Sequence, residues 1–206
     1  LKAHQNRHKL DLQVEEKGID GPVTRVDRYL EQLTIDTLRK SYKNHSFLGE
    51  EFGMQEGKGH DADWCWVIDP LDGTLNFVHG FPHFCISIAV QHKGVTQHGV
   101  IYDPVKDELF SASRGRGAMM NQRRIRVNVK DSLDNTFLAV GHAYRAKRDG
   151  EIVSYAKNHF ESLLNVTEAG AQYRRAGSAA LDLAYVAAGR LDGYFELGLK
   201  PWDIAA

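Results

Sequence analysis

Two aspartates three residues apart, Asp69 and Asp72, follow an apolar stretch of the chain. Pro70 predicts a turn between them, and Gly73-Thr74 comes next, where a short helix could begin. Mg²⁺ prefers a few oxygen ligands in near-octahedral geometry, with substrate phosphate completing the shell. Both carboxylates and the Leu71 carbonyl could supply such ligands, and amides at a helix start could face an anion. The segment therefore predicts a metal-assisted phosphate site.

The same residues would also form a good surface loop, because Asp, Pro and Gly all favour turns. Taken alone, the motif leaves both interpretations open. Two other acidic segments favour the metal site: Glu50 and Glu51 end a short apolar run upstream, and Asp203 follows Trp202 downstream. We therefore expect three distant acidic segments to fold together around bound metal ions.

Four segments resemble those of a known family, in order as well as in content. Residues 49–51, 66–77 and 202–206 look like the three signature segments of the inositol monophosphatase family. Residues 174–190 are similar to its bacterial inositol-1-monophosphatase branch. The resemblance extends from about Lys17 to the last residue.

The resemblance implies an α/β fold, the layered α-β-α-β-α sandwich of the inositol monophosphatase and fructose bisphosphatase superfamily. Family members continue well past the Trp-Asp segment and begin with a helix that is fragmentary here. We therefore expect a single domain over residues 1–206 that lacks the C-terminal part of the family fold. A chain of 206 residues is long enough to bury a sizeable core.

Phosphate monoesters hydrolyse very slowly in water, so a catalyst must lower the barrier by electrostatics and positioning. Two metal ions can do both, by activating water and by stabilising the leaving oxygen. The resemblance implies that Glu50, Asp69 and the Leu71 carbonyl hold the first Mg²⁺. Asp69, Asp72 and Asp203 would hold the second, with Asp69 bridging the two. A third, weaker metal position near Glu50 is also expected.

The resemblance further implies that Glu50 and Thr74 orient and deprotonate the attacking water. Asp27 would support Thr74 from behind, although it could simply be an acid in the first turn of a helix. Lys17 and Glu51 are expected near the site without an assigned role. Because no Cys or Ser nucleophile arrangement is visible, we expect direct attack by water without a covalent intermediate.

Substrate binding is also assigned from the resemblance. The residues concerned are Leu71, Asp72, Gly73, Thr74, Arg174, Gly177, Ser178, Ala179, Glu196 and Asp203. Residues 177–179 would offer amides to a polyol, and Glu196 would accept hydrogen bonds from its hydroxyls. Arg175 could replace Arg174 as the inward-facing arginine, and Glu196 could instead be a surface acid at the end of a strand. Trp202 is expected to pack and fix Asp203.

Four histidines invite a catalytic or metal-binding interpretation. His79 and His83 could act as phosphohistidine or acid catalyst, but the flanking phenylalanines favour structural histidines. His4 and His8 stand four residues apart, yet no acidic third ligand lies near them, so we expect them on the surface.

The composition excludes several classes of function. The 26 basic and 27 acidic residues give a net charge of −1, which leaves no polybasic field for nucleic acid or anionic lipid. The arginines of residues 114–116 and 123–126 are expected to form a solvated hairpin surface. No apolar run is long enough to span a bilayer. Cys65 and Cys85 show no metal-site spacing and are expected as buried thiols in a reducing cytoplasm.

The elements that must position these residues follow from periodicity and turn signals. Helices are predicted from Thr24 to about Leu38, over residues 150–164 and over residues 178–188. Strands are predicted over residues 47–48, 64–68, 84–91, 99–103, 109–112, 124–129, 137–140 and 192–197. The closely spaced hairpins in the middle of the chain indicate one antiparallel sheet there.

The resemblance implies Mg²⁺-dependent hydrolysis of myo-inositol 1-phosphate or a related polyol phosphate, inhibited by Li⁺, in a homodimer. Sugar phosphates, histidinol phosphate and nucleotides remain alternative substrates within the superfamily. A different class also stays open, because bacterial relatives include partners of RNA polymerase or of ribosome synthesis in which catalysis is secondary.

Overall fold

An eight-stranded sheet forms the largest layer of the computed structural model, which describes residues 12–16, 22–142, 145–148 and 151–206. Its strand order is β10-β9-β8-β7-β6-β5-β3-β4. Neighbouring strands are antiparallel except β3 and β5, which are parallel. The strands are β3 (Ser46–Gly49), β4 (Gly53–Gln55), β5 (Trp64–Asp72), β6 (Cys85–His92), β7 (Val95–Asp103), β8 (Glu108–Ser113), β9 (Gly117–Met120) and β10 (Arg123–Arg124).

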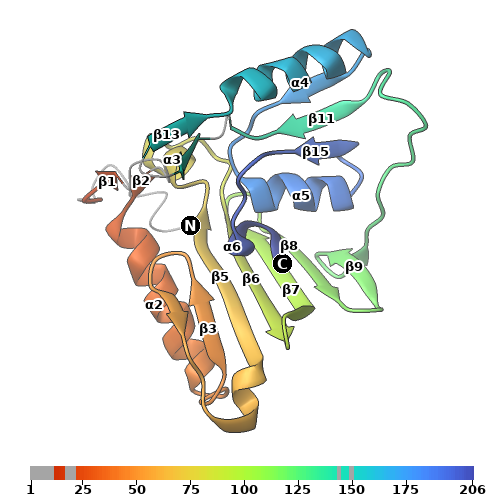
Figure 1. The fold of residues 1–206 in the computed structure, drawn as a ribbon. Helices are drawn as coiled ribbons and strands as arrows, with labels where there is room; N and C mark the ends of the chain where they lie inside the picture. Colours follow the sequence, from red (N-terminus) through yellow and green to blue (C-terminus); the bar gives the residue numbers. More distant parts are fainter. Residues whose placement is uncertain (1–11, 17–21, 143–144, 149–150) are drawn as a thin grey trace.

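Helix α2 (Arg25–Arg39) covers one face of this sheet (Figure 1). Thr24 caps its first turn, because the Thr24 hydroxyl accepts a hydrogen bond from the Val26 amide. Ile35 of the helix packs with Phe47 and Ile68 of the sheet, and all three side chains are fully buried. This apolar contact holds the helix against β3 and β5.

Helix α5 (Ala179–Ala187) covers the opposite face. Its buried Ala180, Leu181 and Ala184 pack against Cys85 and Ile101 of the sheet. A second sheet lies beyond α5 with the parallel order β14-β11-β15, and α4 lies on its far side (Figure 1). These elements are β11 (Phe137–Val140), α4 (Ala156–Glu168), β14 (Gln172–Arg174) and β15 (Gly193–Phe195). The layers are therefore α-β-α-β-α, which confirms the expected fold class.

Short elements complete the described chain. They are β1 (Glu15–Glu16), β2 (Pro22–Val23), a 3-10 turn η3 (Gly59–Asp63), α3 (Thr74–His79), β12 (Arg145–Arg148), β13 (Glu151–Ser154) and α6 (Pro201–Ile204). In the described part of the chain, no helix is both long and apolar enough to cross a membrane. His4, His8 and Lys17 lie outside the described residues.

The expected turn at Pro70 is wrong, because β5 continues as a strand as far as Asp72. Its pairing with β6 shifts register between Asp69 and Asp72, which marks a bulge. Proline lacks an N–H donor and is tolerated in a sheet where ladder pairing is interrupted. The bulge, rather than a turn, therefore separates the two aspartates.

Two other sequence-based predictions are also wrong. The strand after the glycine-rich turn is Gly117–Met120 rather than residues 124–129, since only Arg123–Arg124 pairs further along. The helix predicted from residue 150 begins at Ala156 instead. Ile152 and Val153 lie in β13, where β-branched side chains suit the paired backbone of a hairpin.

Candidate active site

The bulge in β5 buries Asp69, whose exposed fraction is only 2%. Its Oδ1 accepts a hydrogen bond from the Leu71 amide at 3.0 Å. Leu71 is itself buried in a cluster with Val26, Phe77 and Phe84. The end of β5 is thus anchored by the apolar packing of Leu71 and carries the buried carboxylate of Asp69.

Asp72 follows the bulge and contacts the start of helix α5. Its Oδ2 accepts hydrogen bonds from the Ser178 hydroxyl at 2.8 Å and from the Ala180 amide at 2.7 Å. Free amides at a helix start stabilise a carboxylate. The carboxylate therefore ties β5 to α5, although the two elements are more than a hundred residues apart in the chain.

Thr74 begins the short helix α3 and contacts Asp27 of helix α2. The Thr74 hydroxyl donates to Asp27 Oδ1 at 2.8 Å, while the Leu71 carbonyl lies 3.1 Å away. Asp27 is 1% exposed, and its Oδ2 accepts from the backbone and the hydroxyl of Thr24. Asp27 thus closes a capping box for its own helix and also binds Thr74.

Glu50 and Asp203 come from the other two acidic segments. The Glu50 amide donates to the Ile68 carbonyl at 3.2 Å, so this residue lies beside the end of β5. Asp203 lies in α6, where its Oδ2 accepts from the Lys200 amide at 2.6 Å. The Trp202 carbonyl accepts from Ser87 of β6 at 3.3 Å, which anchors α6 on the sheet.

The charges of all three acidic segments interact at Asp69. Burial raises the pKa of Asp69 well above its usual value, and the charges of Asp72, Glu50 and Asp203 raise it further. Burial also raises the pKa of Asp72 to about 6, although its bonds from Ser178 and from the start of α5 lower it. For Asp203, burial raises the pKa and nearby Glu196 adds to the effect. Like charges gathered around a buried carboxylate, with raised pKa values, indicate a candidate functional site.

The chemistry of this donor set fits a hard divalent cation, which prefers carboxylate and carbonyl oxygens. In Asp69, Asp72 and Asp203 the protein donors gather on one carboxylate oxygen, so the other oxygen is the one suited to a metal. Among the residues that the structure describes, however, no three Asp, Glu, His or Cys side chains form a group that could hold a metal ion as they stand. The expected cage thus requires some of these side chains to shift.

Glu196 is held just after β15. Its Oε1 accepts from the His142 amide at 2.9 Å, and its Oε2 accepts from the Tyr194 hydroxyl. Gly141 leaves room for this carboxylate, since a Cβ there would overlap it. Burial and Glu196 both raise the pKa of Tyr194, so the phenol stays protonated as the donor. The charge of Glu196 also raises the pKa of Asp203, so Glu196 lies at the edge of the acidic site.

The two candidate arginines differ in their contacts. Arg174 donates to the Tyr173 carbonyl at 2.9 Å and stacks on the Phe137 ring, with 5.0 Å between guanidinium and ring centre. Arg175 lies 2.6 Å from Nδ1 of His142, the residue whose amide binds Glu196. Arg175 is therefore the arginine on the Glu196 side.

The loop before α5 carries the other expected substrate residues. Ser178 is 1% exposed, and its hydroxyl is engaged by Asp72 rather than open to a ligand. The amide of Ala179 also interacts with Asp72. Gly177 is exposed and adopts a φ of +86°, a conformation that favours glycine.

Asn76 is a residue that the sequence did not single out. Its Nδ2 lies 2.7 Å from the His83 carbonyl and 2.8 Å from the Ala176 carbonyl, with the Gly177 carbonyl at 3.3 Å. Asn76 therefore ties α3 to the loop before α5. Only its place in the segment 66–77 could have indicated a role.

His83 fits the expected structural role, whereas His79 is not packed in the core. His83 is buried, and its Nε2 lies 3.1 Å from Oδ1 of buried Asp182 in α5. His79 is exposed at the end of α3. Both cysteines are free, with Cys85 buried and Cys65 half-buried.

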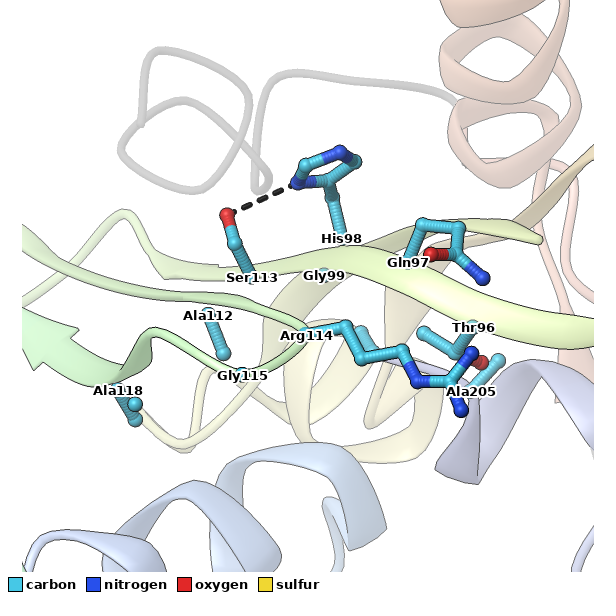
Figure 2. Close-up of a pocket in the computed structure, with 12 residues that line it drawn as sticks. Thr96, Gln97, His98, Gly99, Ala112, Ser113, Arg114, Gly115, Ala118 and Ala205 are labelled. Carbon is cyan, nitrogen blue, oxygen red and sulfur yellow. Dashed lines mark hydrogen bonds between the residues drawn. The ribbon is translucent and has the colours of Figure 1, made fainter. Parts of the chain in front are cut away.

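A cavity of the described chain lies elsewhere. It has a volume of about 420 Å³ and follows β7, β8 and the last residues (Figure 2). It is lined mainly by small residues and by His98, whose Nδ1 lies 2.9 Å from the Ser113 hydroxyl. No Asp or Glu side chain lines this cavity. The carboxylates, rather than this cavity, therefore mark the candidate active site.

Comparisons with known proteins show which family the chain resembles. Residues 2–206 match the model of the inositol monophosphatase family. The chain is 51% identical to a protein of Pseudomonas aeruginosa named Nus factor SuhB, over 95% of this chain and 70% of that relative.

Solved structures share the fold. An extragenic suppressor protein suhB from Bartonella henselae superposes with a TM-score of 0.86 at 41% identity, over all of this chain and 77% of the other. An inositol monophosphatase from Anabaena (Nostoc) gives a TM-score of 0.76 at 42% identity, over 87% of this chain and 68% of the other.

Proposed function

The chain belongs to the inositol monophosphatase family, and from this premise we propose that it is a Mg²⁺-dependent phosphomonoesterase. We propose myo-inositol 1-phosphate or a related small polyol phosphate as its substrate. The observation that carries the proposal is the electrostatic meeting of Asp69 with Glu50, Asp72 and Asp203, which come from three distant segments. Such a buried acidic group is suited to hold cations that polarise a bound ester.

The residues that would hold the metal are those assigned from the family. Glu50, Asp69 and the Leu71 carbonyl would hold one Mg²⁺, and Asp69, Asp72 and Asp203 a second, with a third, weaker position near Glu50. Bound Mg²⁺ would lower the pKa of a coordinated water and stabilise negative charge on the phosphate. Li⁺ would inhibit by competing at a weakly held position.

Thr74 and Glu50 would orient and deprotonate the attacking water. Because the Thr74 hydroxyl donates its proton to Asp27, its oxygen is left to accept a hydrogen bond from water. Glu50 would then take the proton that the water loses as it attacks phosphorus. No protein side chain needs to bond to the phosphoryl group in this scheme.

Substrate contacts divide between two sides of the site. Leu71, Asp72, Gly73, Thr74 and Asp203 would surround the phosphate. Glu196, fixed by Tyr194 and His142, would accept hydrogen bonds from polyol hydroxyls. Gly177 and its neighbours Ser178 and Ala179 would border the polyol through the backbone. For the arginine we favour Arg175 over Arg174, because of its contact with His142.

Phosphate release from inositol 1-phosphate, with and without Mg²⁺, tests the proposal. Asp69→Asn should abolish turnover, whereas Asp103→Asn should retain it, because Asp103 is also buried but lies at the end of β7 and binds amides of the turn that follows. Full activity of Asp69→Asn would contradict the proposal. Relative kcat/KM values for inositol, fructose, histidinol and nucleotide phosphates would fix the substrate class.

A partner role in transcription is the second candidate. It is favoured by the relative of 51% identity that is named a Nus factor. With a net charge of −1, the chain would act through protein contacts rather than through a basic surface for nucleic acid. Capture of purified transcription proteins by both the wild type and Asp69→Asn would support this role, and loss of capture in Asp69→Asn would tie it to the acidic site.

We also place the protein in the cytoplasm as a homodimer. Free cysteines suit a reducing compartment. Light scattering after size exclusion would measure the oligomeric state, and a monomer at micromolar concentration would contradict the dimer.

A further inference from the structure

Helix α2 carries two buried acids one turn apart, and each of them holds a different part of the candidate site. Asp27 binds the Thr74 hydroxyl. Glu31 is fully buried, with an exposed fraction of 0%, and lies four residues further along the same helix. Residues with this spacing share one helical face. The function proposed above uses Asp27 and leaves Glu31 without a role.

The Glu31 carboxylate binds the loop that carries Glu50. Its Oε2 accepts from the Glu51 amide at 2.8 Å, and its Oε1 accepts from the Phe52 amide at 2.9 Å. Two successive N–H groups therefore meet two carboxylate oxygens. A glutamine in this place would keep one acceptor but turn an NH₂ group toward the other amide.

Gly49 completes the contact from the other side of Glu50. A Cβ on Gly49 would overlap the Glu31 carboxylate, so only glycine lets the carboxylate lie against the strand. Glu50 therefore lies between Gly49 and Glu51, whose backbones both contact the Glu31 carboxylate. Its own amide binds Ile68, the residue before Asp69. The backbone of Glu50 is fixed from both directions.

We propose that Glu31 is a positioning residue that sets the place of Glu50 relative to Asp69 and Thr74. Its carboxylate determines the affinity of the metal position that Glu50 and Asp69 would share. This inference rests on the proposed function, in which Glu50 is a metal ligand. Groups that orient metal ligands from behind typically change metal affinity by about 10–100-fold when they are removed.

A purely structural role would lower the stability of Glu31 variants without changing metal affinity in the folded fraction. The test therefore measures Mn²⁺ binding to the full chain by electron paramagnetic resonance, without substrate. Circular dichroism gives the folded fraction of each variant, and the bound Mn²⁺ is expressed per folded molecule. Glu31→Gln should bind Mn²⁺ about tenfold or more weakly than the wild type.

Asp103→Asn is the matched control. Asp103 is also fully buried, and its Oδ1 accepts from two backbone amides, Val105 and Lys106, at 2.8 and 3.0 Å. This variant should bind Mn²⁺ as the wild type does. Wild-type affinity in folded Glu31→Gln, or an equal loss in Asp103→Asn, would overturn the inference.

Gly49→Ala provides a second variant, because it displaces the same carboxylate while keeping every charge. It should weaken Mn²⁺ binding, and the double variant with Glu31→Gln should lose less than the product of the two single losses. Unchanged affinity in Gly49→Ala, or fully multiplicative losses, would also overturn the inference. A wild type that binds Mn²⁺ but releases no phosphate would contradict the proposed function alone.

Discussion

The Thr74 hydroxyl donates a hydrogen bond to buried Asp27 across 47 residues of chain, at 2.8 Å. This contact joins the start of α3 to the first turn of α2. The Thr74 proton points toward Asp27 or toward the Leu71 carbonyl, which lies 3.1 Å away. The remaining lone pairs of Thr74 are then available to orient a water molecule, which is the role proposed for this residue.

Asp27→Asn should lower kcat by about 10–100-fold with little change in KM, as expected for loss of a supporting contact behind a catalytic group. An asparagine amide can donate to Thr74, so the threonine oxygen would lose a lone pair with which it would orient the water. Steady-state kinetics with inositol 1-phosphate measure the effect. Asp36→Asn, an exposed acid on the same helix, should behave as the wild type. A kcat for Asp27→Asn within twofold of the wild type would contradict the role of Asp27.

The metal-free protein should become more stable as the pH falls from about 7.5 toward 5. Burial raises the pKa of Asp72 from 3.8 to about 6, so the folded chain binds a proton that the unfolded chain releases. The resulting destabilisation is fully present above pH 6 and disappears as the pH falls toward 3.8.

Thermal melts in a chelator at several pH values measure this dependence. Histidines titrate in the same range, so the informative quantity is the difference between wild type and Asp72→Asn, whose Tm should change less with pH. Saturating Mg²⁺ should reduce the gain in Tm at low pH, because the metal favours the ionised carboxylate. Equal pH dependence of the two metal-free proteins would refute the assignment to Asp72.

Ser178→Ala should raise the pKa of Asp72, because the serine hydroxyl is one of the donors that lower it. The acid limb of the kcat/KM profile should move to higher pH, and the free energy of unfolding should fall by about 1–3 kcal/mol. Ser113→Ala removes a hydroxyl that contacts His98 rather than one of the acids, and serves as control. An unshifted acid limb would show that Ser178 does not tune Asp72.

Asn76→Asp should destabilise the fold by about 2 kcal/mol, because a carboxylate would face the carbonyls of His83 and Ala176 where an amide now donates. Urea unfolding measures the change. A loss below about 0.5 kcal/mol, the range of ordinary surface substitutions, would mean that these contacts contribute little.

Local signals were enough to predict much of the fold. Thr24 and the apolar spacing after it predicted α2, and residues 137–140 were predicted as a strand with the observed bounds. The bulge at Pro70 is not predicted from the sequence, because a proline between two acids is typical of a turn. In the structure, pairing with β6 keeps the segment in the sheet. β9 escaped because Gly117 and its neighbours carry no strong strand signal of their own.

The site was harder to predict wherever a role depends on long-range contacts. The sequence indicated the acids of all three segments, and the structure brings their charges together. It did not reveal that the Ser178 hydroxyl faces Asp72, or that Arg175 rather than Arg174 lies beside His142. Glu31 reads as one more acid on an amphipathic helix, and only its burial distinguishes it.

The central claim is that Glu50, Asp69, Asp72 and Asp203 close around divalent cations. Anomalous diffraction from crystals soaked in Mn²⁺ and phosphate tests this claim most directly, since Mn²⁺ accepts the same carboxylate ligands as Mg²⁺. We predict two peaks about 3.5–4 Å apart, with Asp69 bound to both ions. Ordered carboxylates that remain apart, with no anomalous peak within bonding distance of Asp69, would contradict the account.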